Sequence, residues 1–216
     1  MRIPVELPRC YRLLNHGPTT LITTANEGRA NVMAAAWVMP LDFTPPKVAV
    51  VFAQDTYTRF LVDATGEFAI NVPPRALAEL TQAVGSVGGR EVDKIARYSI
   101  ATFSASMISV PLVEKCVAWL ECRVISEPAI QQSYDLFVAE VVAAWADDRV
   151  FSNGKWHFPD EAHRTLHHVS GGSFFVTGNS IELPRPDETG SVRPSSPGLI
   201  DRPLFGGSLI PGKKKG

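Results

Sequence analysis

The chain has 216 residues, of which 45% are hydrophobic and 20% are charged, and its formal net charge is −1. This length suits one domain, or one domain with an added tail, and is enough to bury a hydrophobic core. A near-neutral charge favours neither nucleic acid nor an anionic membrane as a partner. The first residues lack the apolar segment of a signal peptide, and no apolar run approaches the ~18 residues of a membrane-spanning helix. We therefore expect a soluble cytoplasmic protein.

Three cysteines are scattered along the chain, at Cys10, Cys116 and Cys122, and none forms a C-x-x-C motif. If Cys116 and Cys122 share one strand, they lie roughly 20 Å apart, which is far beyond the reach of a disulfide. An odd and scattered set is typical of a reducing compartment. We expect three buried thiols and no disulfide.

Strand patterns dominate the chain. Residues 19–39 contain two β-rich runs around an Asn-Glu-Gly turn at 26–28, which predicts a hairpin. Single strands are expected over 47–53, 67–73, 117–127 and 134–146. Two further hairpins are predicted over 149–158, with its turn at Asn153-Gly154, and over 174–183, with its turn at Gly178-Asn179.

Helix patterns are few and short. Residues 56–66 follow a candidate threonine N-cap and end at Gly66, residues 74–85 open with proline and close with glycine, and residues 90–98 form a third candidate. Many short strands with turn residues between them predict a mainly β, antiparallel barrel, with the helices as caps. From residue 184 onward the chain is rich in Pro, Gly and Ser. We expect a domain over 1–183 and an extended tail over 184–216, which includes the solvated basic end.

The segment 47–73 has the order strand, hydroxyl-rich loop, helix, strand. Free N–H groups and the positive end of the helix dipole make the start of such a helix an anion site, and threonine hydroxyls and an arginine add donors. The competing interpretation is ordinary capping of the helix by Thr56. The candidate phosphate ligands are Gln54, Asp55, Thr56, Thr58 and Arg59.

Three consecutive alanines, Ala34 to Ala36, leave the middle of a predicted strand almost without side chains. Bare main chain allows a flat ligand to lie close to it, with Met33 and Trp37 as polarisable walls. Close packing of the strand against a helix also selects alanine, so this pattern alone leaves both interpretations open.

Several blocks in this order resemble the flavin reductase-like family, which has the FMN-binding split-barrel fold. They are TTLITT, a W-x-x-P followed by Pro-Pro and an apolar strand, a T-x-T loop, GEFAINVP, and the apolar strand FVAEVV. The resemblance covers roughly residues 10 to 183. It implies an antiparallel split barrel that forms a homodimer, FMN as the cofactor, and flavin sites near the subunit interface.

The same resemblance assigns site residues. It places the flavin ring against the strand that holds Asn31, Met33, Ala34, Ala35, Ala36 and Trp37, and the phosphate at the loop from Gln54 to Arg59. Asn71, Gly85, Ser86 and Lys94 match the family more loosely. Asn71 could instead satisfy strand-end backbone groups, Gly85 could be a helix stop, and Lys94 could lie on the surface.

The resemblance implies an oxidoreductase in which NAD(P)H reduces the flavin, and the flavin serves a small acceptor or a partner monooxygenase. Such chemistry needs binding and orientation rather than a nucleophile, which fits a chain without G-x-S-x-G, H-E-x-x-H or Walker motifs. No catalytic residue is assigned. Many active family members carry Gly-Asp-His before the long strand, where this chain has Ser133-Tyr134-Asp135. This departure keeps a non-catalytic FMN carrier as an alternative, with a β-barrel interaction module as a third.

Three histidines cluster near residue 165. If the segment were helical, His163 and His167 would share a face, as two metal ligands can. The sequence supplies no third ligand at a suitable spacing, so no metal site is predicted. We place His168 near the edge of the flavin.

Overall fold

The computed structural model describes residues 1–183, and its first compact unit is Met1–Gly178. The tail predicted over 184–216 lies outside the described residues. No helix in the described part is long and apolar enough to cross a membrane.

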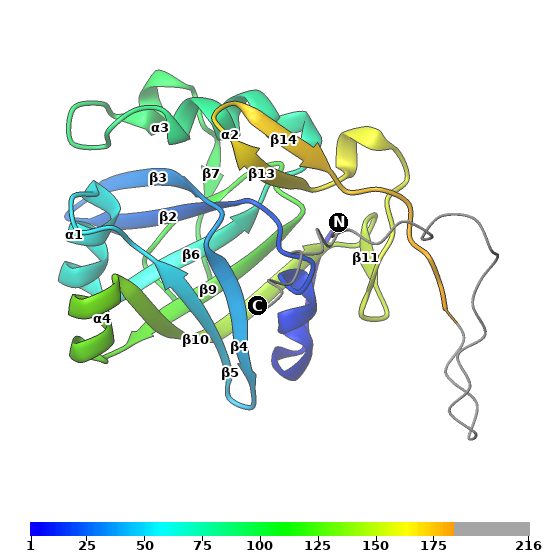
Figure 1. Cartoon of the computed structure of the whole chain (residues 1–216), viewed down its shortest axis with the longest axis horizontal. Helices are drawn as coiled ribbons and strands as arrows, with labels where there is room; N and C mark the ends of the chain where they lie inside the picture. Colours follow the sequence, from blue (N-terminus) through cyan, green and yellow to red (C-terminus); the bar gives the residue numbers. More distant parts are fainter. Residues whose placement is uncertain (184–216) are drawn as a thin grey trace, which may run out of the picture. The chain divides into compact units, whose positions relative to one another are not determined.

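One antiparallel sheet of eight strands forms the framework (Figure 1). The order of seven of them is β3-β2-β6-β9-β10-β5-β4, and β1 pairs with β10. This confirms a mainly β, antiparallel fold with few helices. The strands are β1 (Arg2–Pro4), β2 (Thr20–Asn26), β3 (Arg29–Ala35), β4 (Val38–Phe43), β5 (Pro46–Val51), β6 (Glu67–Val72), β9 (Ala118–Ile125) and β10 (Leu136–Asp147).

Three small hairpins accompany this sheet. They are β7 (Thr102–Phe103) with β8 (Leu112–Val113), β11 (Phe151–Ser152) with β12 (Lys155–Trp156), and β13 (Leu166–Ser170) with β14 (Ser173–Val176). The second has its turn at Asn153 and Gly154, as predicted, and both residues adopt positive φ. The last hairpin turns around Gly171, so the turn predicted at Gly178-Asn179 is wrong.

The helices are short. They are α1 (Tyr57–Thr65), α2 (Ala78–Gly85), α3 (Lys94–Arg97) and α4 (Pro128–Tyr134), with 3-10 turns η1 (Leu7–Leu13), η2 (Arg75–Leu77) and η3 (Glu161–His163). Helix α1 has the predicted limits because Thr56 caps its start and Gly66, at φ 68°, ends it. The third helix is shorter than predicted, because Asp93 provides the N-cap and the helix ends at Arg97.

The path of seven strands ends in the edge strands β3 and β4, which follow each other in the chain. The hairpin predicted over 19–39 is confirmed for β2 and β3, but β3 ends at Ala35 and the chain bends at Ala36 and Trp37 before β4 begins. Among the described residues no pairing joins β3 to β4, so the strand pairing does not close the sheet into the barrel that the resemblance implies.

Apolar side chains pack on both faces of the sheet. One cluster contains Phe52, Phe68 and Phe137, whose rings meet edge to face at about 5 Å. The other contains Leu21 and Val84 and lies under α2. Burial on both faces explains why the strands read as nearly continuous apolar runs. The three cysteines are free and buried, as predicted.

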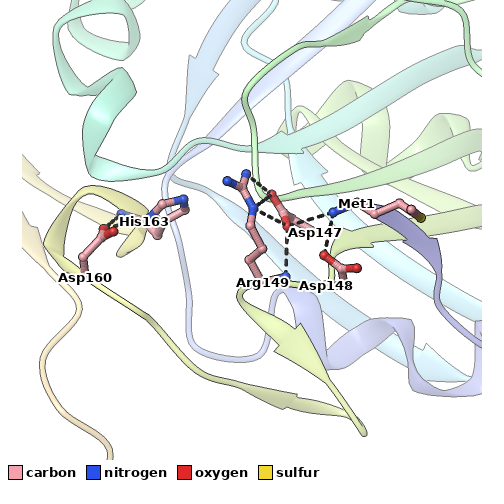
Figure 2. Close-up of polar contacts among 6 residues, drawn as sticks. All are labelled: Met1, Asp147, Asp148, Arg149, Asp160 and His163. Atoms are coloured by element: carbon pink, nitrogen blue, oxygen red, sulfur yellow. Dashed lines mark hydrogen bonds and ion pairs between the residues drawn. The ribbon is translucent and has the colours of Figure 1, made fainter.

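The amino terminus is held at the end of β10 by charges (Figure 2). The Met1 ammonium lies 2.5 Å from Asp148 Oδ1 and 3.7 Å from Asp147 Oδ1. Hydrogen bonds from Arg149 hold the pKa of Asp147 below its ordinary value. In the same view His163 Nδ1 lies 2.7 Å from Asp160. The contacts of Met1 anchor β1 beside β10.

Candidate functional site

A cavity of about 250 Å³ lies at the end of β3, and we call it the alanine cavity. Four segments line it: the residue before β2, the end of β3, the carboxyl end of α2, and the β13–β14 hairpin. The lining residues are Thr19, Ala34, Ala35, Ala36, Thr81, Gln82, Gly85, Ser86, His168, Gly171 and Phe174.

The three alanines play different parts in this cavity. Ala34 packs under α2, where a Cβ on Gly85 would lie only 3.2 Å from the Ala34 Cβ. Ala35 is 8% exposed and joins the core, whereas Ala36 is exposed at the mouth. Close packing of α2 thus accounts for Ala34, and Ala36 is the alanine that is exposed beside the cavity.

Met33 and Trp37, which the sequence suggested as walls for a flat ligand, lie outside the alanine cavity. Trp37 is 75% exposed and Met33 packs against the core, and neither lines the alanine cavity. Besides Thr19 and the alanines, the lining residues come from α2 and its end and from the hairpin, and of these the sequence indicated only Gly85, Ser86 and His168 as site residues. The Gly171-Gly172 pair was the sequence signal for the hairpin turn.

The amino end of α1 lies near the opposite end of β3. Thr56 caps the helix and accepts a hydrogen bond from Arg59 N at 3.2 Å, so the capping interpretation holds for this side chain. Thr58 is buried and accepts a bond from Asn31 Nδ2 at 3.0 Å. Asn31 and Ala35 are four residues apart on β3, or about 13 Å. One strand thus links the helix end to the alanine cavity.

Gln54 and Asp55 form the exposed turn just before α1. Arg59, in contrast, points into the protein and is 9% exposed. Its guanidinium stacks 4.4 Å from the Phe137 ring centroid. Its hydrogen-bond partners are the carboxylates of Asp63 and Asp135 and the carbonyls of Phe52 and Gln131. These contacts hold α1 and the end of α4 against the sheet.

Two other arginines flank the amino end of α1, and sequence reasoning missed both. Arg29 donates to Gly89 O at 2.8 Å and lies 4.8 Å from the Tyr57 ring centroid, and Arg90 lies 5.6 Å from the same ring. A Cβ on Gly89 would fall 2.3 Å from Asn31 Oδ1, so only glycine allows the loop to approach β3 this closely. The approach depends on a long-range contact that has no local sequence signal.

The more loosely matched residues have structural partners. Asn71 is fully buried, donates to Leu21 O at 2.9 Å and accepts from Val113 N at 2.7 Å, which satisfies backbone groups between strands. Lys94 is 4% exposed and donates to Val84 O at 2.7 Å, near the carboxyl end of α2. Burial lowers the pKa of Lys94. Ser86 donates to Gln82 O at the end of α2.

The position of the missing Gly-Asp-His motif is occupied by the end of α4. Asp135 follows this helix at φ 55°, and its carboxylate lies 3.3 Å from Arg59 Nη1. Tyr134 is 71% exposed. An acidic side chain held by an arginine thus stands at the position where the resemblance leads one to expect histidine.

The histidines do not share a helix face. His163 lies in η3, whereas His167 and His168 lie in β13, so the segment is not the single helix that a shared face would require. In the described part of the chain no group of three potential ligands could hold a metal. His168 lines the alanine cavity, and its Nε2 donates to Gly171 O at 3.1 Å.

The family model described as "Flavin reductase like domain" matches residues 12–166. The chain belongs to the flavin reductase-like family. It is 47% identical over 182 residues to the uncharacterized protein YddH of Escherichia coli (strain K12), a match that covers 83% of this chain and 96% of YddH.

Solved structures agree with this family assignment. An FMN-binding domain of a flavin reductases-like enzyme from Shewanella baltica OS155 has a TM-score of 0.82 and 43% identity, and the match covers 85% of this chain and 98% of that one. Flavoredoxin from Methanosarcina acetivorans has a TM-score of 0.64 and 26% identity, with 77% and 87% covered. The family match ends at Leu166, where the β13–β14 hairpin of this flavin reductase-like chain begins.

Proposed function

We propose that this chain is an FMN-binding oxidoreductase, which takes electrons from NAD(P)H and delivers them to a small acceptor or a partner oxygenase. The observation that carries the proposal is the pairing, on the single strand β3, of the alanine cavity at one end with the amino end of α1 at the other. The FMN-binding Shewanella baltica relative, at 43% identity, supports the choice of cofactor.

The residues at the two ends of β3 suit the ring and the phosphate of FMN. Bare main chain at Ala34 to Ala36 suits a flat ring, because its N–H and C=O groups can meet the ring's heteroatoms. The dianionic phosphate suits the Thr58 hydroxyl, the free N–H groups at the start of α1, and the charges of Arg29 and Arg90. Bound there, FMN would supply the hydride chemistry.

The protein's own contribution is binding, orientation and partial exclusion of water. The wall made by α2 and the hairpin covers the faces of the cavity that β3 leaves open. The mouth at Ala36 stays accessible, which a nicotinamide or an acceptor needs to approach the ring. No proton-transferring side chain is required for hydride transfer itself.

The decisive experiment is spectroscopic. The purified protein is expected to quench FMN fluorescence at micromolar concentrations, and the bound flavin is expected to bleach within seconds of anaerobic mixing with NADH or NADPH. Unquenched FMN would refute flavin binding and favour an interaction module. Bound flavin that resists both nicotinamides would favour an electron carrier. The carrier is the second candidate because the resemblance leads one to expect a histidine just before β10, where this chain has Asp135 bonded to Arg59.

Filling the alanine cavity is expected to block the ring. Ala35→Leu would overpack the core, because Ala35 is 8% exposed, so Ala36→Leu at the mouth is the better variant. For Ala36→Leu we expect the dissociation constant for FMN, measured by fluorescence quenching, to rise at least tenfold. The midpoint of urea unfolding should stay unchanged. Ala162→Leu, an exposed site in η3, is the matched control. Equal affinity in both variants would move the ring away from β3.

The proposal includes a homodimer. The edge strand β4 and the bend before it expose a row of apolar side chains. This row begins directly after Ala36, at the mouth of the cavity. A second copy on this row would bury it and bring both flavin sites near the interface. The row consists of Trp37, Met39, Leu41 and Phe43.

A further inference from the structure

The β13–β14 hairpin forms one wall of the alanine cavity, and it lies beyond the region that the family model matches. His168, Gly171 and Phe174 contribute to the lining from this hairpin. In Figure 1 the hairpin lies beside α2. The distance at Gly172 agrees with this, because a Cβ added there would lie 3.7 Å from the Gln82 side chain of α2. This wall therefore lies outside the residues that the family model matches.

Specific hydrogen bonds fix the hairpin at the cavity. Thr19 N donates to Leu166 O at 2.7 Å, and His168 N donates to Thr19 Oγ1 at 2.8 Å. The next side chain of the strand, His167, faces away from the cavity, where it contacts Gly17 O at 3.0 Å and Thr177 Oγ1 at 3.1 Å. The two adjacent histidines thus have different environments on opposite faces of β13.

The imidazole of His168 is oriented before any ligand binds. Nε2 donates to Gly171 O at 3.1 Å, and the ring meets Phe174 edge to face with centroids 5.4 Å apart. The hydrogen bond places the proton of the neutral ring on Nε2, which leaves Nδ1 able to take up a second proton. Among the described residues that line the cavity, His168 alone has an ionisable side chain.

We propose that His168 sets the redox balance of the flavin by placing a protonatable imidazole beside the ring. The proposal rests on the FMN site described above. When hydride passes from a reduced nicotinamide to a flavin, the nicotinamide gains one positive charge and the flavin ring one negative charge. An imidazolium at the cavity wall attracts the reduced ring more than the neutral oxidised ring. His168 therefore makes the reduced flavin bind more tightly relative to the oxidised form.

The test compares the midpoint potential of the FMN-loaded protein with that of His168→Gln. Glutamine keeps a donor for Gly171 O but carries no charge. We expect the preference for reduced over oxidised FMN to fall about tenfold, which corresponds to about 30 mV for a two-electron couple. His168→Arg restores a charge and is expected to retain most of the preference.

His167→Gln is the matched control, because it makes the same change on the opposite face of the same strand. It is expected to leave the midpoint potential unchanged. An unaltered potential in His168→Gln, or an equal fall in both glutamine variants, would overturn the proposal. The affinity of the wild-type protein for oxidised FMN is measured first. If it binds no FMN, the proposed function fails; if it binds and the variants show no difference, only the role of His168 fails.

Discussion

At the scale of single residues, Arg59 shows how one side chain can match a family motif and still serve the scaffold. Its guanidinium joins α1 to Asp135 after α4 and stacks on Phe137 in the core. We expect Arg59→Ala to lower the free energy of unfolding by about 3 kcal/mol, because it leaves buried carbonyl groups and a carboxylate without their donor. Urea denaturation measures this loss.

A second arginine provides the contrast to Arg59. Arg90 is exposed and lies beside Tyr57 at the start of α1. Arg90→Ala is expected to weaken FMN binding severalfold and to leave the unfolding midpoint in place, which is the reverse of the result for Arg59→Ala. If Arg59→Ala proves stable and loses FMN, the phosphate lies on the inner side of α1 instead.

At the scale of elements, a buried carboxylate orders the connection between β7 and β8. Glu121, on β9, is fully buried and accepts bonds from Ser106 N, Met107 N and Trp145 Nε1. Burial pushes its pKa up, but these hydrogen bonds outweigh burial and hold the pKa of Glu121 below its ordinary value. The carboxylate therefore stabilises the fold in its charged form.

The pH dependence of stability follows from the lowered pKa of Glu121. Because the folded pKa of Glu121 is lower than the unfolded value of about 4.3, its contribution is complete above that pH and is lost as the pH falls through the folded value. At neutral pH we expect Glu121→Gln to cost about 2 kcal/mol in urea unfolding. The difference from wild type should shrink in acid. A difference that stays constant down to about pH 3 would show that the charge is not what holds the segment.

The sequence predicted correctly the helix α1, whose ends are fixed by neighbouring residues. Thr56 and Gly66 bound α1 correctly because a cap and a left-handed glycine act within one turn. The final hairpin was misplaced because two glycine-containing turns competed, and contacts of Thr19 with the strand at Leu166 and His168 decide between them. The site divides in the same way. The alanines and the helix end were visible in the sequence, whereas the walls from α2 and the hairpin depend on distant segments meeting.

At the scale of the whole molecule, the edge strand β4 is the main unexplained surface. Trp37, Met39, Leu41 and Phe43 are 75%, 54%, 49% and 59% exposed, and they lie on β4 or directly before it, with a bulge between Pro40 and Asp42. Several exposed apolar side chains along an edge strand are a liability for a monomer, because they favour association with another chain. A second copy that covers this row would remove that liability.

The proposed dimer is tested by placing charges in this row of side chains. Met39→Glu with Leu41→Glu places two carboxylates in the row, and burying them would cost several kcal/mol each, so the dimer should dissociate. Sedimentation equilibrium should give about twice the chain mass of 23.5 kDa for the wild-type protein and the single-chain mass for the variant. Leu183→Glu, at a residue that is 77% exposed and outside the sheet, should remain dimeric. A double variant that keeps the wild-type mass would place the interface on another face. If the monomer also binds FMN more weakly, the second copy contributes to the flavin site, because the row begins at Trp37, next to Ala36 at the cavity mouth.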